Sequence, residues 1–205
     1  MELYFSPLAC SMATRIALYE AGADASFIRA DTKVKRTADG GDFLAINPMG
    51  QVPTLRIDDG ELLTENLAVL QYVADRFPAA ELAPTAGGIE RYRLQQWLSF
   101  IATELHKAVF IPLLDRTSPG GAKDFAHQKV GPRFAYLAKH LDGREHLLDR
   151  FTVADAYLAT VLNWCRPSGV ELSEWPAVQA YHRRMLARPS IAKAFAEERA
   201  LYEAG

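Results

Sequence analysis

The residue pattern of the chain changes once, at a stretch rich in proline, glycine and alanine, and this change constrains the fold more than any other feature. Residues 78–88, PAAELAPTAGG, have the composition of a linker. Before this stretch, β-prone runs alternate with helical patterns, and after Ile89 only helical patterns follow. The sequence therefore predicts an α/β domain over residues 1–77 and an all-α domain over residues 89–205.

The first domain begins with the order strand, helix, strand. ELYF (2–5) and SFIRA (26–30) are β-prone runs, and SMATRIALYEAGA (11–23) between them has a helical period that Gly22 is suited to end. This order favours a parallel pair of strands joined by a right-handed crossover.

A hairpin and two helical segments complete this domain. In TLRIDDGELL (54–63), two alternating runs flank Asp59-Gly60, a pair favoured in type I′ turns. A short helical turn is expected around 43–46, and TENLAVLQYVADRFP (64–78) predicts a helix that its final proline ends. We therefore expect a mixed four-stranded sheet with helices.

The second domain shows no strand signals, no internal repeats and no low-complexity segments. Helical periods are expected at about 89–116, 123–141, 152–165 and 176–188, with a last helix from about 190.

Composition and charge argue against several classes of protein. Hydrophobic residues make up 49% of the 205 residues and charged residues 23%, and the net charge of -2 lacks the basic surplus of a nucleic-acid binder. No signal-peptide pattern and no apolar run of about 18 residues are visible, so we expect neither export nor a membrane span. The two distant cysteines, Cys10 and Cys165, do not resemble a secreted disulfide framework, which favours free thiols in a reducing cytosol.

Cys10, in LACSMATR (8–15), is the first candidate for chemistry. A lone cysteine is most often a small buried apolar residue. Cys10, however, lies between a predicted strand and a predicted helix, whose N-terminus stabilises a thiolate or another anion. Position 13 is Ala13, so there is no C-x-x-C motif and any redox cycle needs an external thiol. The residues alone leave four readings open: nucleophile, redox thiol, contact point for another thiol, and buried residue.

Val52-Pro53 lies at the entrance to the predicted hairpin. A proline in this position usually only starts or borders a strand. If the peptide bond is cis, the Val52 N–H and C=O would be exposed to pair with a peptide-like ligand in the manner of an added strand.

Thr64, Glu65 and Asn66 mark the turn from a predicted strand into a helix. One reading is helix capping, with Thr64 as the N-cap and Glu65 favoured by the helix dipole. The other reading is ligand recognition, because Asn66 and free N–H groups suit a carboxylate and Glu65 suits an ammonium. Together these groups fit an α-amino acid head group.

These motifs, in this order, resemble those of cytosolic glutathione S-transferases. YFSPLACS resembles the bacterial beta class, in which a cysteine lies near the sulfur of glutathione. NPMGQVPTL, LTENLAVLQYVAD and FTVADAYL match the family in order and spacing, and the likeness covers essentially the whole chain. The resemblance implies a thioredoxin-like N-terminal domain followed by an all-α domain.

The resemblance also implies which residues of the first domain bind glutathione. Cys10 would face the glutathione thiol. The Val52 main chain, before a cis Pro53, would pair with the cysteinyl backbone. Glu65 and Asn66 would hold the γ-glutamyl end.

Two further residues of the first domain gain a role only through the resemblance. Lys35 matches the lysine that meets the glycyl carboxylate in this class; otherwise it would be read as a solvated surface charge. Ser11, beside Cys10, would help to polarise the glutathione sulfur through its hydroxyl or its N–H.

One helical segment of the second domain adds candidates. In QQWLSFIATELHKAVF (95–110), Ser99, Thr103 and His106 are spaced i, i+4 and i+7, which predicts one shared polar face; scattered polar residues on an exposed helix are the alternative. The resemblance implies that His106 lies close to the sulfur site and that the other polar positions reach glutathione from the neighbouring subunit. Ser99 and Thr103 depart from the asparagine and acidic residue of the family. Glu104 is a further candidate, Lys107 lies nearby, and the assignment of the cross-subunit contacts stays open.

Two more positions are interpreted as structural. Thr152 and Asp155, in FTVADAYL, have the spacing of an N-capping box before an apolar helix, and in this family the box supports folding. Cys165, in NWCRP, is expected to pack at a helix end.

The implied function is transfer of glutathione, as co-substrate and without a metal, to small hydrophobic electrophiles. The catalytic residues would be Cys10, Ser11 and His106. A mixed disulfide at Cys10 would add thiol-disulfide exchange or reductive dehalogenation.

The expected setting is the cytoplasm, with a second copy of the chain as partner and with no nucleic acid or membrane. A non-catalytic glutathione-transferase-like module that binds a partner protein is the alternative, whereas Ala13 and the helical half disfavour a single-domain thioredoxin-type reductase. The electrophile pocket is expected between the domains, near Pro7, Leu8, His106, Phe110 and Trp164.

Overall fold

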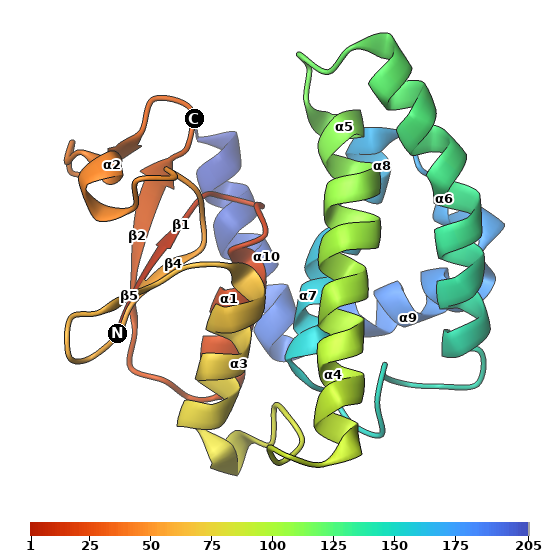
Figure 1. The fold of residues 1–205 in the computed structure, drawn as a ribbon, viewed down its shortest axis with the longest axis horizontal. Coiled ribbons are helices and arrows are strands. Elements are labelled where there is room, and N and C mark those ends of the chain that lie inside the picture. The colour runs from red at the N-terminus through yellow and green to blue at the C-terminus, as the bar shows by residue number, and fades with distance from the viewer. Residues whose placement is uncertain (205) are drawn as a thin grey trace. The chain divides into compact units, whose positions relative to one another are not determined.

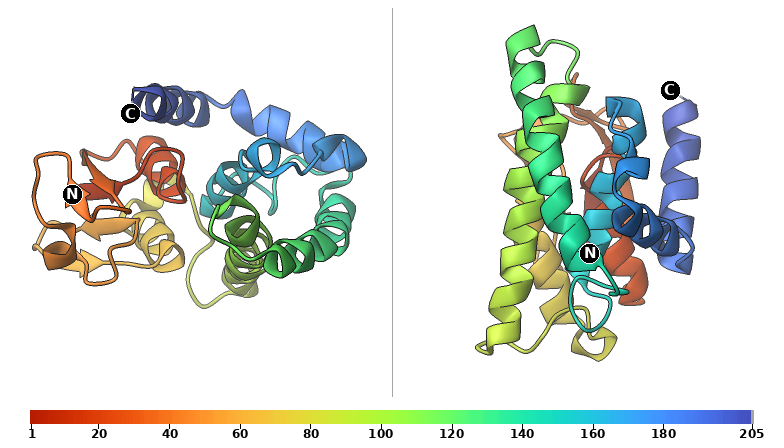
Figure 2. Two further views of the ribbon diagram at one scale, coloured as in Figure 1. Left: turned by 90° about the horizontal axis from the view of Figure 1, so that it is seen from above. Right: turned by 90° about the vertical axis from the view of Figure 1, so that its right-hand side faces the viewer.

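The computed structural model describes residues 1–204, and their contacts group into two compact units. The first unit comprises Met1–Ala83 and the C-terminal segment that begins at Pro189, and the second comprises Pro84–Arg188. These units differ from the expected domains in the last helix, which the sequence analysis assigned to the all-α part. In the structure this helix packs against the first helix of the chain and so joins the α/β unit (Figure 2).

The first unit contains all the strands among the described residues. Its elements are, in chain order, β1 (Glu2–Phe5), α1 (Met12–Glu20), β2 (Ser26–Asp31), β3 (Arg36–Thr37), α2 (Phe43–Ile46), β4 (Thr54–Arg56), β5 (Leu62–Leu63), α3 (Asn66–Arg76), the 3₁₀ helix η1 (Pro78–Ala80) and α10 (Pro189–Glu203).

The sheet has the strand order β3-β2-β1-β4-β5 (Figure 1). β1 pairs in parallel with β2, where Leu3 lies opposite Phe27, and antiparallel with β4, where Leu3 lies opposite Leu55. The predicted parallel pair and the mixed sheet are therefore confirmed. The fifth strand, β3, lies between the predicted strand at 26–30 and the helical turn at 43–46, where no element was predicted, because two residues are too few for an alternating pattern to show.

Apolar side chains cover both faces of this sheet. Successive side chains of β1 point to opposite faces. Tyr4 packs with Ala30 of β2 and with Phe43 of α2, so the buried Leu3 and Phe5 point to the other face. The helices α1 and α3 lie on the side of the sheet opposite α2 (Figure 1). The loop between β1 and α1 is thus held at the edge of a buried core.

The turn of the predicted hairpin differs from the expected type. The Ile57 N–H donates to the Glu61 carbonyl, the Gly60 N–H donates to the Ile57 carbonyl, and Gly60 has a φ of 90° whereas Asp59 has a negative φ. A type I′ turn needs positive φ at both central residues, and the observed hydrogen bonds instead fit a three-residue loop with one left-handed glycine. The predicted hairpin is present and the predicted turn type is wrong.

The second unit is helical. Its elements are α4 (Ile89–Phe100), the π-helix η2 (Ile101–Phe110), α5 (Ile111–Leu114), α6 (Gly120–Leu141), α7 (Val153–Leu162), α8 (Cys165–Ser168), the 3₁₀ helix η3 (Leu172–Glu174) and α9 (Pro176–Leu186).

One continuous helix of 26 residues is made of α4, η2 and α5, and α6 runs antiparallel beside it (Figure 1). Its middle part is π-helical, with the Ile111 N–H bonded to the His106 carbonyl. By length and composition this helix could cross a membrane, which the sequence analysis did not expect. Its buried side chains, among them Leu98 and Leu105, and the packing of η2 against α6 and α7 give it the role of a core helix.

Candidate functional site

The Cys10 thiol contacts the main chain just before β4. Cys10 is half-buried in the loop between β1 and α1, and its Sγ donates to the Val52 carbonyl oxygen at 3.1 Å. The Val52-Pro53 peptide bond is cis, as the resemblance implied. The fold thus brings together two features that lie 42 residues apart in the sequence and that were both predicted to belong to one site.

Ser11 turns its hydroxyl into the same loop. The side chain is fully buried; its Oγ accepts from the Ser6 N–H at 3.2 Å and donates to the Ser6 carbonyl at 3.3 Å. The Ser11 hydroxyl therefore donates its proton to a carbonyl of the same loop. This arrangement suits a residue that shapes the loop around Cys10.

Lys35 lies against the turn that precedes the cis proline. Its φ is 58°, and its Nζ donates to the Gly50 carbonyl at 2.9 Å. Gly50 has the same φ of 58°, and a Cβ built on it would lie 2.7 Å from Lys35 Cδ and 2.9 Å from Nζ. A Cβ at this position would therefore displace the Lys35 side chain, and the positive φ is itself strained for residues other than glycine.

The start of α3 corrects one prediction and leaves another in place. The N-cap of α3 is Glu65 and no side chain caps it, so the predicted cap at Thr64 is wrong. Glu65 is exposed, with φ 64° and ψ 114°, which is rare for a residue other than glycine and typical of functional positions. Its carboxylate remains available for the predicted ammonium.

Asn66 points into the unit rather than outward. It is 6% exposed, its Oδ1 accepts from the Thr14 hydroxyl at 3.1 Å, and its Nδ2 is buried without a hydrogen-bond partner among the described residues. Its side chain therefore ties α3 to α1. Contact with a ligand through its main chain or through Nδ2 stays a prediction.

His106 is buried within the helical unit. It is 7% exposed, its Nδ1 lies 2.7 Å from the Tyr157 hydroxyl, and its ring meets Trp164 edge to face at 4.8 Å. Burial, with a smaller contribution from the Lys107 charge, lowers the pKa of His106 to about 4. The imidazole is therefore neutral at physiological pH.

The predicted polar face of this helix is wrong. Ser99 and Thr103 are exposed, whereas His106 is buried. The i, i+4, i+7 spacing gives one face only in an α-helix, and this helix is π-helical over Ile101–Phe110, which changes the direction of the side chains there.

The polar residues near His106 have local partners. The Thr103 hydroxyl donates to the Ser99 carbonyl at 2.9 Å. Glu104 forms an ion pair with Arg133 of α6, with Oε2 at 2.6 Å from Nη2 and 3.0 Å from Nε. Glu104 thus joins two helices of the same unit.

The positions interpreted as structural agree with that reading. The Thr152 N–H and hydroxyl donate to Asp155 Oδ2 at 2.9 and 3.1 Å, and both residues are fully buried at the start of α7, so the capping box is present. Cys165 is 2% exposed, and burial raises its pKa to about 12, so its thiol is protonated and inert.

Two charged side chains near the Cys10 loop were missed by the sequence analysis. Arg15 and Glu198 are buried against each other in the first unit. A signal was present, because Arg15 lies three residues after Met12 and Glu198 lies seven after Ile191, on the buried faces of their helices. A charged residue on an apolar face indicates a buried pair.

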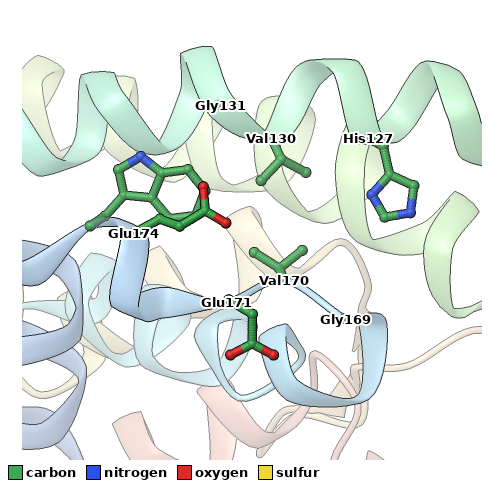
Figure 3. A pocket seen from close by; sticks show the side chains of 8 residues that line it. His127, Val130, Gly131, Gly169, Val170, Glu171 and Glu174 are labelled. Atoms are coloured by element: carbon green, nitrogen blue, oxygen red, sulfur yellow. The ribbon is translucent and has the colours of Figure 1, made fainter.

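The helical unit also contains a hollow of about 220 Å³ (Figure 3). It is lined by His127, Val130, Gly131, Gly169, Val170, Glu171, Glu174 and Trp175. None of the predicted site residues lines it. Among residues 1–204, no group of three or more His, Cys, Asp or Glu side chains is placed to hold a metal ion.

Comparison with known proteins accounts for both units. Residues 1–75 match the N-terminal domain of glutathione S-transferases, and residues 100–189 match the C-terminal domain. Glutathione S-transferase GstA of Escherichia coli O157:H7 is 40% identical over 200 residues, which cover 97% of this chain and 98% of that protein. The chain belongs to the glutathione S-transferase family.

Two solved glutathione S-transferases are similar to it in structure. A sphingomonad enzyme in complex with glutathione is 44% identical with a TM-score of 0.92, over 97% of this chain and 98% of that one. The bacterial beta-class glutathione S-transferase of Sphingomonas chungbukensis has the same identity, TM-score and coverage. The resemblance to the beta class and the expected fold class are thus confirmed.

Proposed function

We propose that this glutathione S-transferase joins the glutathione thiol to small apolar electrophiles. The observation that carries the proposal is the family likeness over both halves of the chain, together with a Cys10 thiol that lies on the Val52 main chain beside a cis proline. Glutathione is the co-substrate, in keeping with the glutathione-bound sphingomonad relative.

The first unit offers groups for each part of glutathione. The Val52 carbonyl accepts from Cys10 and has a second lone pair for a peptide N–H. Lys35 Nζ, which donates to the neutral Gly50 carbonyl, suits the glycyl carboxylate. The exposed Glu65 suits the γ-glutamyl ammonium.

The chemical task is to make the glutathione thiol ionise near neutral pH. A free thiol with a pKa of about 8.5 is only a few per cent thiolate at pH 7, and each unit by which the pKa falls takes about 1.4 kcal/mol of preferential thiolate binding. When glutathione binds, Cys10 would turn its S–H from the Val52 carbonyl to the bound sulfur, in a loop whose shape depends on Ser11. A role for His106 would rely on the neutral imidazole, because its pKa is lowered to about 4.

Cys10 would also support exchange with glutathione mixed disulfides. Its thiolate attacks the glutathionyl sulfur of R–S–S–G, and R–S⁻ leaves and takes up a proton. The thiolate of a second glutathione then attacks the glutathionyl sulfur bound to Cys10, which yields glutathione disulfide and the free Cys10 thiolate. In this cycle glutathione provides the second thiol, which the chain lacks because position 13 is Ala13 and not a cysteine.

A homodimer in the cytoplasm is the expected setting. Exposed apolar side chains on α4, Ile89 at 65% and Tyr92 at 60%, suit a partner surface. Sedimentation velocity across a range of concentrations tests this assembly; a sedimentation coefficient of a single chain at every concentration would refute it.

The activity is tested with a panel of aryl halides, peroxides, disulfides and haloaromatic ring-cleavage products, each with glutathione. Retention on immobilised glutathione, with elution by free glutathione, separates an enzyme from the non-catalytic module, for which no retention and no turnover are expected. Cys10→Ala should abolish disulfide exchange and lower conjugation only in part, because the bound sulfur loses one of its donors, whereas the matched variant Cys165→Ala should leave both activities unchanged. Loss of both activities in Cys10→Ala would assign Cys10 to conjugation itself.

A further inference from the structure

The C-terminal helix reaches the loop that carries Cys10. Glu198 of α10 is fully buried, and its Oε2 accepts from the Leu8 N–H at 2.7 Å across 190 residues of sequence. Leu8 has a φ of 59°, a left-handed conformation that is strained in a residue with a Cβ. Leu8 lies two residues before Cys10, so the hydrogen bond fixes the loop at its most strained point.

Arg15 faces the other oxygen of the same carboxylate as an ion pair. Its Nε lies 3.1 Å from Glu198 Oε1 without the alignment of a hydrogen bond, and its guanidinium lies between the rings of Phe5 and Phe27, at 4.1 and 4.2 Å from their centroids. The arginine cannot move away without leaving this aromatic clamp. Through Arg15, Glu198 is held against α1 and the two strands that carry Phe5 and Phe27. Its other oxygen, Oε2, faces the Leu8 N–H.

The charged groups around Glu198 are few. Arg15 faces it from α1, and Glu197 precedes it on α10; Glu197 in turn contacts Arg15, the Tyr19 hydroxyl and Lys193. Burial raises the pKa of Glu198 to about 7, although Arg15 and the Leu8 N–H both favour the carboxylate. The ionised form, which dominates above pH 7, accepts the stronger hydrogen bond from Leu8.

We propose that Glu198 is a positioning residue for Cys10: its carboxylate holds Leu8 in the left-handed conformation and so keeps the Cys10 thiol on the Val52 carbonyl. The consequence for catalysis rests on the proposed glutathione transferase function. The effect on the position and reactivity of the Cys10 thiol does not rest on that function, because it can be measured on the protein alone.

The first test measures the rate at which iodoacetamide alkylates Cys10 in the absence of glutathione, with the modified peptide identified by mass spectrometry. Glu198→Ala releases the loop and should raise this rate about tenfold, the equivalent of one lost hydrogen bond to a charged group. The matched control is Glu197→Ala, which also removes a contact to Arg15 but does not touch the loop. Equal rates in the two variants, or a slower rate in Glu198→Ala, would overturn the proposal.

Glu198→Gln separates positioning from folding, because it keeps the size of the side chain and one neutral acceptor. At pH 6 the wild-type carboxyl is protonated, so both proteins should react at the same rate. At pH 8 the wild-type carboxylate holds Leu8 more tightly, so the variant should react several-fold faster. A ratio of rates that does not change between pH 6 and pH 8 would contradict the assignment.

The second test measures kcat/KM for glutathione in the same variants. We expect about a tenfold loss in Glu198→Ala, partial rescue in Glu198→Gln and little change in Glu197→Ala. If the wild type itself shows no turnover, the proposed function fails while the alkylation rates still decide the role of Glu198. If turnover is normal in Glu198→Ala, the positioning role fails alone.

Discussion

Replacement of Asp155 should unfold the helical unit more readily than replacement of any exposed aspartate. Asp155 is fully buried and accepts from the Leu147 N–H, the Thr152 N–H and the Tyr181 hydroxyl at 2.8–2.9 Å. In Asp155→Ala the two backbone N–H groups cannot rotate towards other partners, and each buried donor left without one costs about 1–3 kcal/mol. Burial raises the pKa of Asp155, which shows that the buried charge is unfavourable in the folded state. Its removal in the variant therefore offsets part of the stability that is lost. The net expectation is a loss of roughly 3 kcal/mol.

The assay is thermal unfolding followed by circular dichroism, with Asp149→Ala, in the loop before α7, as the control. Asp149 is exposed, and its replacement should change stability by less than about 0.5 kcal/mol. In a chain of this size 1 kcal/mol corresponds to about 2–4 °C, so Asp155→Ala should melt about 10 °C lower. If the two variants melted within 2 °C of each other, roughly the effect of 1 kcal/mol or less, the carboxylate would not support the start of α7.

Three further results are expected. Cys165 should stay unmodified by iodoacetamide in the native protein at pH 8, because burial raises its pKa to about 12; mass spectrometry of the digested protein checks this, and fast labelling would contradict it. Gly50→Ala should raise the KM for glutathione several-fold by displacing Lys35, whereas Gly22→Ala, at a similar positive φ but with nothing within 4 Å of its new Cβ, should lose only stability. The Cε1 resonance of His106 should not titrate in NMR spectra between pH 5 and 8, because its pKa is about 4; a midpoint near 6.5 would show that the ring is solvated.

Local patterns predicted the elements of this protein well. The parallel pair and the helical turn at 43–46 follow from periodicity and breakers within short windows. The turn type at Asp59-Gly60 and the cap of α3 were wrong, because several conformations suit the same local residues and the surrounding chain selects one of them.

The candidate site was predicted in part, and the reason differs between its residues. Cys10, Val52 and Pro53 were singled out from the residues and given their roles by the resemblance, and in the structure the Cys10 thiol donates to the Val52 carbonyl. The orientation of Ser11 could not be predicted, because a serine at a helix entrance can cap the helix, face a ligand or close its own loop. The burial of His106 was missed because the α-helical period does not hold in η2.

The sequence by itself determined the division into an α/β part and a helical part, the absence of a second cysteine at Ala13 and the capping box at Thr152 and Asp155. Each of these is written within a few residues or in the period of a helix or strand. Only the tertiary structure decided that α10 joins the first unit and that Glu198 holds the loop of Cys10. A hydrogen bond across 190 residues leaves no local pattern, because the chain must first be packed before the two groups can meet.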